Sequence, residues 1–89
     1  MKLYFTTELA KRIKKLKQRE PSLYTKIQNK LKLFEQNHRH LTLHNHKLKG
    51  KLENVWSVSI EKNFRMLYYV KNDWAVFFLI GTHDEVYKK

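Results

Sequence analysis

The spacing of the apolar residues changes about halfway along this 89-residue chain. In residues 7–36 apolar side chains recur every three or four positions, which is the spacing of one face of a helix. In residues 55–80 they gather in short blocks, and the first block alternates with serine, as in a strand with one buried face. A helical half followed by a strand-forming half predicts an α+β domain.

Two helices are expected in the first half, after a short strand at residues 2–6. The first begins near Thr7, whose hydroxyl can cap it, and Pro21 suits the first turn of the second, where its missing N–H costs nothing. The apolar stripes are Leu9, Ile13 and Leu16 in the first helix and Leu23, Ile27, Leu31 and Phe34 in the second. Because only a few residues separate the helices, we expect a hairpin that shares one core.

Three strands are expected in the second half, at residues 55–60, 64–70 and 74–80, joined by turns at 62–63 and 71–73. The predicted order is β-α-α-β-β-β, with the helical hairpin packed on one face of a small, mostly antiparallel sheet. The opposite face is left partly open, and we expect a ligand to bind there.

Length and composition exclude several classes of protein. With two glycines, one proline and no linker-like segment, residues 1–89 are expected to form a single domain. The chain has no cysteine, which excludes a disulfide framework, a thiolate zinc site and a cysteine nucleophile. The longest apolar run, residues 74–80, is too short to cross a bilayer, and no segment reads as a secretory signal. We therefore expect a cytoplasmic protein with no membrane partner.

The positive charge lies in the first half of the chain. Nineteen Lys and Arg residues against eight Asp and Glu residues give a net charge of +11. Residues 1–51 hold fourteen basic and three acidic residues, whereas residues 52–89 hold five of each. Such a distribution favours binding to a polyanion, with nucleic acid the first candidate, an acidic protein the second and an anionic membrane surface the third. Solubility alone is the plain alternative.

Four of the five histidines lie in the polar connection between the halves, residues 37–51. They are His38, His40, His44 and His46. The spacing of the last two can place both rings on one side of an extended segment, but no third and fourth ligand accompany them. We expect solvated loop residues, with no metal ion and no cofactor.

The segment after the last strand carries residues suited to chemistry. Gly81 is expected to let the chain leave the sheet sharply, which delivers His83 and Tyr87 to one end of the open face. Arg65 lies beside them if the last two strands are antiparallel. Histidine moves protons near neutral pH, arginine binds phosphate, and tyrosine stacks on bases.

Those residue types together are typical of a ribonuclease that needs no metal ion. In this chemistry the RNA 2′-hydroxyl attacks its own phosphate, a base takes the proton, a cation stabilises the phosphate and an acid protonates the leaving 5′ oxygen. The alternative is a structural role, in which Arg65 pairs with Glu61 or Glu85 and His83 caps the chain end.

Three segments resemble a known family when taken in order: His46 to Gly50, Phe64 to Val70 and Ile80 to Tyr87. Their order and spacing are similar to the RelE/ParE superfamily of bacterial toxins, closest to its RelE- and YafQ-like mRNA interferases, over the whole chain. The resemblance implies a RelE-like fold and a toxin of a type II toxin–antitoxin pair, which enters the ribosomal A site and cuts messenger RNA. A cognate acidic antitoxin is the implied protein partner.

The resemblance also implies roles for individual residues. The family's arginine falls on Arg65, expected to stabilise the phosphate, and its terminal aromatic falls on Tyr87, expected to orient the substrate. The histidine after the glycine falls on His83, expected as general acid. The histidine before the Leu-x-Gly step falls on His46, a candidate base or phosphate contact.

Contacts to messenger and ribosomal RNA are expected from the basic half and the open sheet face. The residues are Lys11, Lys14, Lys15, Lys47, Lys49 and Lys51, with Ser57 and Ser59 where RelE-like members carry lysines. Two alternatives stay open: a ParE-like toxin that binds gyrase without cutting RNA, and a plain RNA-binding module.

Overall fold

The computed structural model describes residues 1–48 and 54–87. The elements in chain order are β1 (Lys2–Phe5), α1 (Thr7–Arg19), α2 (Pro21–Gln36), the 3-10 turn η1 (Leu41–Leu43), β2 (His46–Lys47), β3 (Val55–Glu61), β4 (Phe64–Lys71), β5 (Trp74–Thr82) and α3 (His83–Tyr87). The predicted α+β class, helical hairpin and three-strand meander are confirmed. The short strand β2 and the short helix α3 were not predicted.

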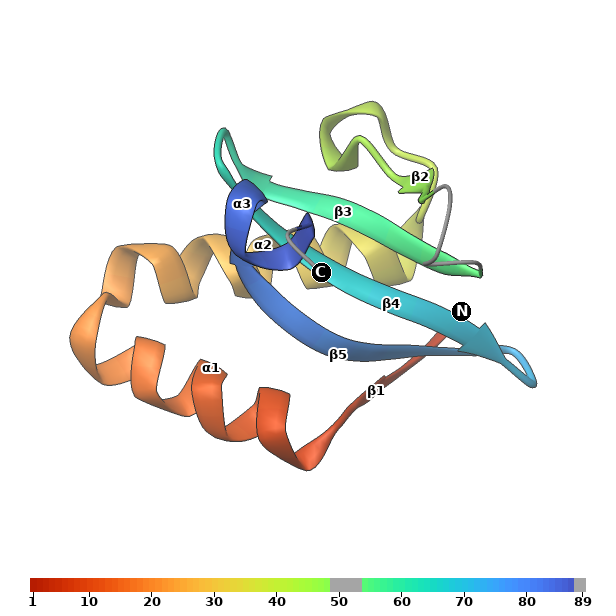
Figure 1. Cartoon of the computed structure of the whole chain (residues 1–89). Helices are drawn as coiled ribbons and strands as arrows, with labels where there is room; N and C mark the ends of the chain where they lie inside the picture. The colour runs from red at the N-terminus through yellow and green to blue at the C-terminus, as the bar shows by residue number, and fades with distance from the viewer. Residues whose placement is uncertain (49–53, 88–89) are drawn as a thin grey trace.

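The sheet has five strands in the order β1-β5-β4-β3-β2 (Figure 1). The strand β1 lies parallel to β5, with Lys2 opposite Trp74, and the other neighbouring strands are antiparallel. The turn between β4 and β5 consists of Asn72 and Asp73, which have φ values of 49° and 69°. Positive φ at both positions is what a two-residue hairpin turn of type I′ requires.

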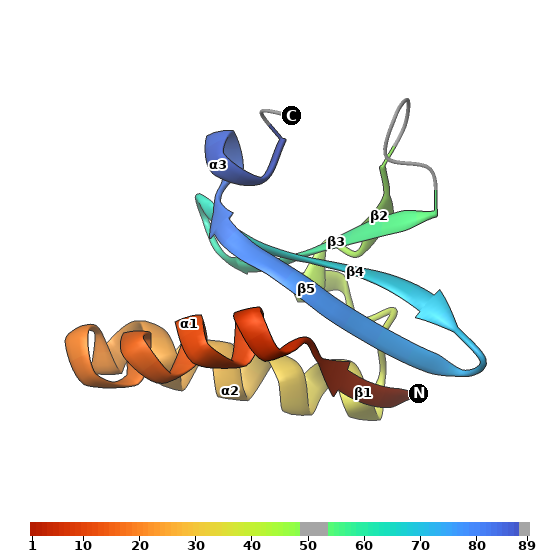
Figure 2. The ribbon, with the colours of Figure 1, turned by 60° about the horizontal axis from the view of Figure 1, so that its bottom comes forward.

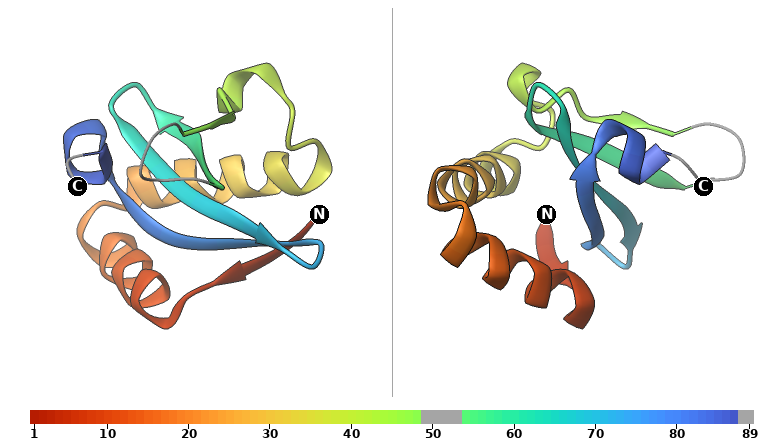
Figure 3. Two further views of the ribbon diagram at one scale, coloured as in Figure 1. Left: turned by 45° about the vertical axis from the view of Figure 1, so that its right-hand side comes forward. Right: turned by 60° about the vertical axis from the view of Figure 1, so that its left-hand side comes forward.

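The helices α1 and α2 cover one face of the sheet, and α3 lies over the opposite face (Figure 2). The right-hand view of Figure 3 shows the sheet between the helical hairpin and α3. The core lies under the hairpin, where Phe34 of α2 contacts Tyr68 and Phe77 edge-on at ring-centroid distances of 5.1 and 5.3 Å. Alternation along β3 and β4 puts Val58 and Tyr68 in this core and turns Ser57 and Arg65 to the opposite face.

The cap of α1 lies one residue earlier than predicted. The side chain of Thr6, and not that of Thr7, accepts a hydrogen bond from the Leu9 N–H at 3.3 Å. The residue at the N-cap has extended backbone and lies outside the helix, whereas Thr7 is already helical. The predicted place of Pro21 in the first turn of α2 is confirmed.

Candidate active site

The hydroxyl of Ser57 joins two of the predicted site residues. Ser57 lies in the middle of β3 and is fully buried. Its Oγ accepts hydrogen bonds from Arg65 Nε at 2.6 Å and from the Tyr87 hydroxyl at 2.7 Å. Arg65 comes from the adjacent strand β4 and Tyr87 from α3, so one buried oxygen connects three elements.

A backbone carbonyl just before β2 is a second hydrogen-bond acceptor for Arg65. The carbonyl oxygen of His44 accepts from Arg65 Nη2 at 3.2 Å and lies 3.0 Å from His46 Nδ1. His44 has φ 45° and ψ 44°, the left-handed conformation, and this turn directs its carbonyl at the site. Because a carbonyl only accepts, this contact requires the proton on His46 Nδ1, and when the ring is neutral its free lone pair then lies on Nε2.

His83 lies beside Tyr87 at the start of α3. Its ring packs edge-on against the Tyr87 ring with centroids 4.3 Å apart, and its side chain is 59% exposed. The predicted antiparallel pairing of β4 and β5 is confirmed, and it puts Arg65 opposite Gly81, two residues before His83. The His83 N–H donates to the Asn63 carbonyl at 3.2 Å, which ties the start of α3 to the β3–β4 turn.

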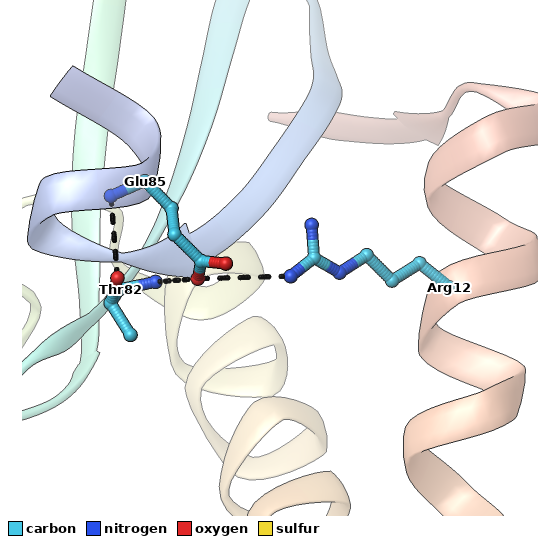
Figure 4. A network of polar contacts seen from close by, with 3 residues as sticks. All are labelled: Arg12, Thr82 and Glu85. Carbon is cyan, nitrogen blue, oxygen red and sulfur yellow. Dashed lines mark hydrogen bonds and ion pairs between the residues drawn. The ribbon is translucent and has the colours of Figure 1, made fainter. Parts of the chain in front are cut away.

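A reciprocal cap holds α3 in place (Figure 4). The Glu85 carboxylate accepts from the Thr82 N–H at 2.8 Å, and the Thr82 hydroxyl accepts from the Glu85 N–H at 3.3 Å. The hydrogen bonds with Thr82 lower the pKa of Glu85, with a smaller contribution from the nearby charge of Arg12. Arg12 of α1 reaches this carboxylate at 3.8 Å, so the cap also contacts the helical hairpin.

Gly81 serves close packing and not the sharp exit predicted for it. It continues β5, and the chain leaves the sheet only after Thr82. A Cβ at Gly81 would lie 2.8 Å from Glu85 Oε1 and 3.1 Å from its Cβ. A larger residue at this position would crowd Glu85, because the side chain of Glu85 folds back over the strand.

Arg65 has no ion-pair partner among residues 1–48 and 54–87. The predicted alternative, a pair with Glu61 or Glu85, is wrong for these residues. Glu61 accepts from Lys26 Nζ at 2.8 Å, and Glu85 is next to Arg12. The guanidinium is oriented by neutral oxygens and keeps its full charge for an anion.

The remaining predicted RNA contacts are spread over the molecule. Lys11, Lys14 and Lys15 are exposed on α1, and Lys47 is exposed on β2 next to His46, while Lys49 and Lys51 lie outside the described residues. Ser57 is fully buried, and Ser59 is 8% exposed with its hydroxyl donating to the Glu61 carbonyl at 3.2 Å. Neither serine offers a free hydroxyl at the surface for RNA. The role of Ser57 is instead to orient Arg65 and Tyr87.

Across the described part of the chain, no group of three or more His, Asp or Glu side chains is placed to hold a metal ion. None of the helices there is long and apolar enough to cross a membrane.

Three contributions to this site were not predicted from the sequence. They are the His44 carbonyl, the Thr82–Glu85 cap and the side chain of Asn45, which lies between His44 and His46 in the chain and accepts from the Tyr68 hydroxyl at 2.9 Å. The cap has a sequence signal, because Thr-x-x-Glu is the pattern of a capping box at a helix start. The other two depend on backbone direction in a polar loop, for which the residue types give no signal.

The chain is similar to bacterial toxins over its whole length. The family described as a bacterial toxin of a type II toxin–antitoxin system, YafQ, matches residues 1–88. No curated protein matches. Among solved structures, YafQ from E. coli strain BL21(DE3) is similar with 15% identity, a TM-score of 0.77 and 96% of each chain covered.

Two further structures have the same fold. A YoeB/ParE toxin from Agrobacterium tumefaciens is 19% identical with a TM-score of 0.79, covering 93% of this chain and 99% of that one. The DinJ–YafQ complex from E. coli holds a chain that is 16% identical with a TM-score of 0.75 and 96% of each chain covered. At these identities the structural likeness establishes the RelE-like fold alone.

Proposed function

The chain belongs to the YafQ family of type II toxins, and on that premise we propose that it is an endoribonuclease that cuts messenger RNA in the ribosomal A site. The observation that carries the proposal is the bridge through Ser57 Oγ between Arg65 and Tyr87. The bridge orients the Arg65 guanidinium on the sheet face opposite α1 and α2, and among the described residues this guanidinium has no acidic partner. His46 faces the same His44 oxygen as Arg65, and His83 packs against Tyr87.

The proposed reaction needs two histidines in different protonation states. His46 Nε2 takes the proton of the RNA 2′-hydroxyl, whose oxygen then bonds to the adjacent phosphorus. The bond from phosphorus to the 5′ oxygen breaks, and protonated His83 gives its proton to that oxygen. The products are a 2′,3′-cyclic phosphate and a 5′-hydroxyl, so atoms and charges balance.

The other two residues stabilise and orient the phosphate. Arg65 faces the phosphate with a charge that is positioned before the substrate arrives, which lowers the energy of the extra negative charge in the transition state. Tyr87 keeps a hydroxyl hydrogen bond to Ser57 while its ring packs against His83. It is expected to stack on or orient the nucleotide next to the scissile bond.

We expect two kinds of acidic partner. Ribosomal RNA would bind the exposed lysines of α1 and Lys47. A cognate acidic antitoxin would neutralise the toxin, as the DinJ–YafQ complex holds a toxin of this fold with its partner. The net charge of +11 suits both partners.

The test compares Arg65→Ala and His83→Ala with Lys71→Ala, an exposed cation at the other end of β4. Both site variants should fold, by circular dichroism and thermal unfolding, and should lose about a hundredfold or more in cleavage rate. Lys71→Ala should retain the wild-type rate. Cleavage is measured by primer extension on a translated message with purified ribosomes, and again without ribosomes.

Other outcomes would lead to different conclusions. Full toxicity and cleavage in both site variants would overturn the catalytic assignment. Intact messages together with altered DNA supercoiling in expressing cells would indicate a gyrase-directed toxin. RNA binding with neither cleavage nor growth arrest would indicate a binding module.

A further inference from the structure

A partly buried hydrogen-bond chain lies under the proposed catalytic face. The Tyr68 hydroxyl donates to Asn45 Oδ1 at 2.9 Å, and Asn45 Nδ2 donates to the His38 carbonyl at 2.9 Å. Tyr68 is 2% exposed and packs in the core below the sheet, against Phe34 and Phe77. The side chain of Asn45 is thereby anchored to the core at one end and to the loop after α2 at the other.

The two neighbours of Asn45 serve the opposite face. His44 contributes the carbonyl that accepts from Arg65 Nη2, and His46 contributes the ring whose Nδ1 faces the same oxygen. The anchored residue thus lies between the two groups that orient the arginine and the proposed base. Any rotation of the Asn45 backbone would move both.

Besides the Asn45 side chain, this segment is held by Leu43, which is fully buried in the core, and by the Leu48 N–H, which donates to the Val55 carbonyl at 2.8 Å. The strand β2 is two residues long, with His46 opposite Ser57 and Lys47 opposite Trp56. His44 carries a left-handed φ of 45°, which costs free energy in a residue other than glycine and persists only where its surroundings hold it.

We propose that Asn45 is a positioning residue of the nuclease: its side chain, held by Tyr68, sets the His44 carbonyl and the His46 ring at the distances that orient Arg65 and fix the proton on Nδ1. The expected effect on catalysis rests on the proposed function. The placement of the His46 ring, by contrast, is argued from the contacts alone and does not depend on that function. Asn45 itself touches no reacting atom.

Tyr68 is suited to this task. Burial raises the pKa of its phenol, with the hydrogen bond to Asn45 acting in the opposite sense. The hydroxyl therefore keeps its proton at neutral pH and remains a donor. Tyr68 and Asn45 also line a hollow of about 390 Å³. When the Tyr68 hydroxyl is removed, water can therefore reach the Asn45 side chain.

The decisive variant is Tyr68→Phe, which deletes one oxygen and keeps the ring in the core. Its matched control is Tyr24→Phe, which deletes a hydroxyl that accepts from Gln28 on the surface of α2. We expect Tyr68→Phe to lower kcat about ten- to a hundredfold with little change in KM, because the reacting groups are misplaced while RNA contacts remain. Tyr24→Phe should retain the wild-type kcat.

The second readout does not depend on activity. The ¹⁵N shifts of the His46 ring, at a pH where it is neutral, should report a single tautomer with the proton on Nδ1 in the wild type. Tyr68→Phe and Asn45→Ala should both give a mixture of tautomers. The double variant should lose no more kcat than Asn45→Ala alone, because both changes break the same hydrogen bond.

The outcomes separate this inference from the proposed function. An unchanged His46 tautomer together with an unchanged kcat in Tyr68→Phe would overturn the positioning role, as would an equal loss in Tyr24→Phe. If the wild type cuts no RNA but the tautomer still responds, the proposed function fails and the placement of His46 by Asn45 stands.

Discussion

At the scale of single residues, the hydroxyl of Ser57 is the smallest group on which the site depends. It accepts from Arg65 and Tyr87 inside the protein, where no water can replace it. Ser57→Ala should cost about 1–2 kcal/mol of unfolding free energy, measured by urea denaturation, because two hydrogen bonds are lost. It should also lower the cleavage rate about tenfold or more, since Arg65 and Tyr87 are no longer held.

The control for this change is Ser22→Ala, an exposed serine in the first turn of α2. It should leave both stability and rate near the wild-type values. If Ser57→Ala cuts RNA at the full rate while Arg65→Ala does not, Arg65 does not need its hydrogen bond to Ser57 for cleavage. The bridge through Ser57 would then contribute to stability alone.

The residue types identified which side chains belong together but not what links them. Arg65, His83 and Tyr87 were predicted to meet because the antiparallel register of β4 and β5 brings them to one end. Ser57 was expected to contact RNA, but alternation along β3 could not show that Arg65 and Tyr87 cover it. The His44 carbonyl escaped prediction because its direction follows from a left-handed φ, which is uncommon in residues other than glycine.

At the scale of elements, the five-residue helix α3 depends on its first turn. Because its pKa is lowered in the folded state, Glu85 stabilises the fold when ionised, and this contribution is lost as the pH falls below the ordinary value of 4.5 and through the lowered one. Glu85→Gln should therefore be less stable than the wild type at pH 7. The difference should shrink towards pH 3.

Thermal unfolding at a series of pH values between 7 and 3 measures this difference. Glu35→Gln, which neutralises an exposed carboxylate on α2, is the matched control. A constant gap between Glu85→Gln and the wild type over the whole range would show that the carboxylate charge adds nothing to the cap.

The length of each helix or strand decided whether it could be predicted from the sequence. Residues 7–36 and 55–80 are long enough to show a helical or alternating period, and the starts of their helices and the bounds of their strands were predicted to within two residues. The strand β2 has two residues and α3 has five, too few for any period. Their presence depends on contacts, with Val55 and Ser57 for the first and with Thr82 and Asn63 for the second.

At the scale of the whole molecule, charge and proposed chemistry occupy different parts of the chain. Residues 1–51 hold the net charge, whereas Arg65, His83 and Tyr87 belong to the neutral part. Replacing Lys11 and Lys15 of α1 with Gln should raise KM for ribosomes and leave kcat unchanged. Each lost phosphate contact should make the slope of log affinity against log salt shallower by about 0.7–0.9.

The matched control replaces two other exposed lysines, Lys32 and Lys71, with Gln and removes the same charge. Ribosome binding is measured by sedimentation from 50 to 300 mM salt, on the order of the range over which such contacts weaken. An identical slope in the two pairs would show that total charge, and not the α1 face, guides binding.

The lengths of the strands bear on self-association. The edge strands β1 and β2 have four and two residues, whereas the inner strands β3, β4 and β5 have seven, eight and nine. Each edge also carries a lysine, Lys2 or Lys47. Short, charged edges give another chain little backbone to pair with, which disfavours edge-to-edge aggregation. The edge strands thereby keep Trp56 and Ser57 of β3, and residues 74–77 of β5, from pairing with another chain.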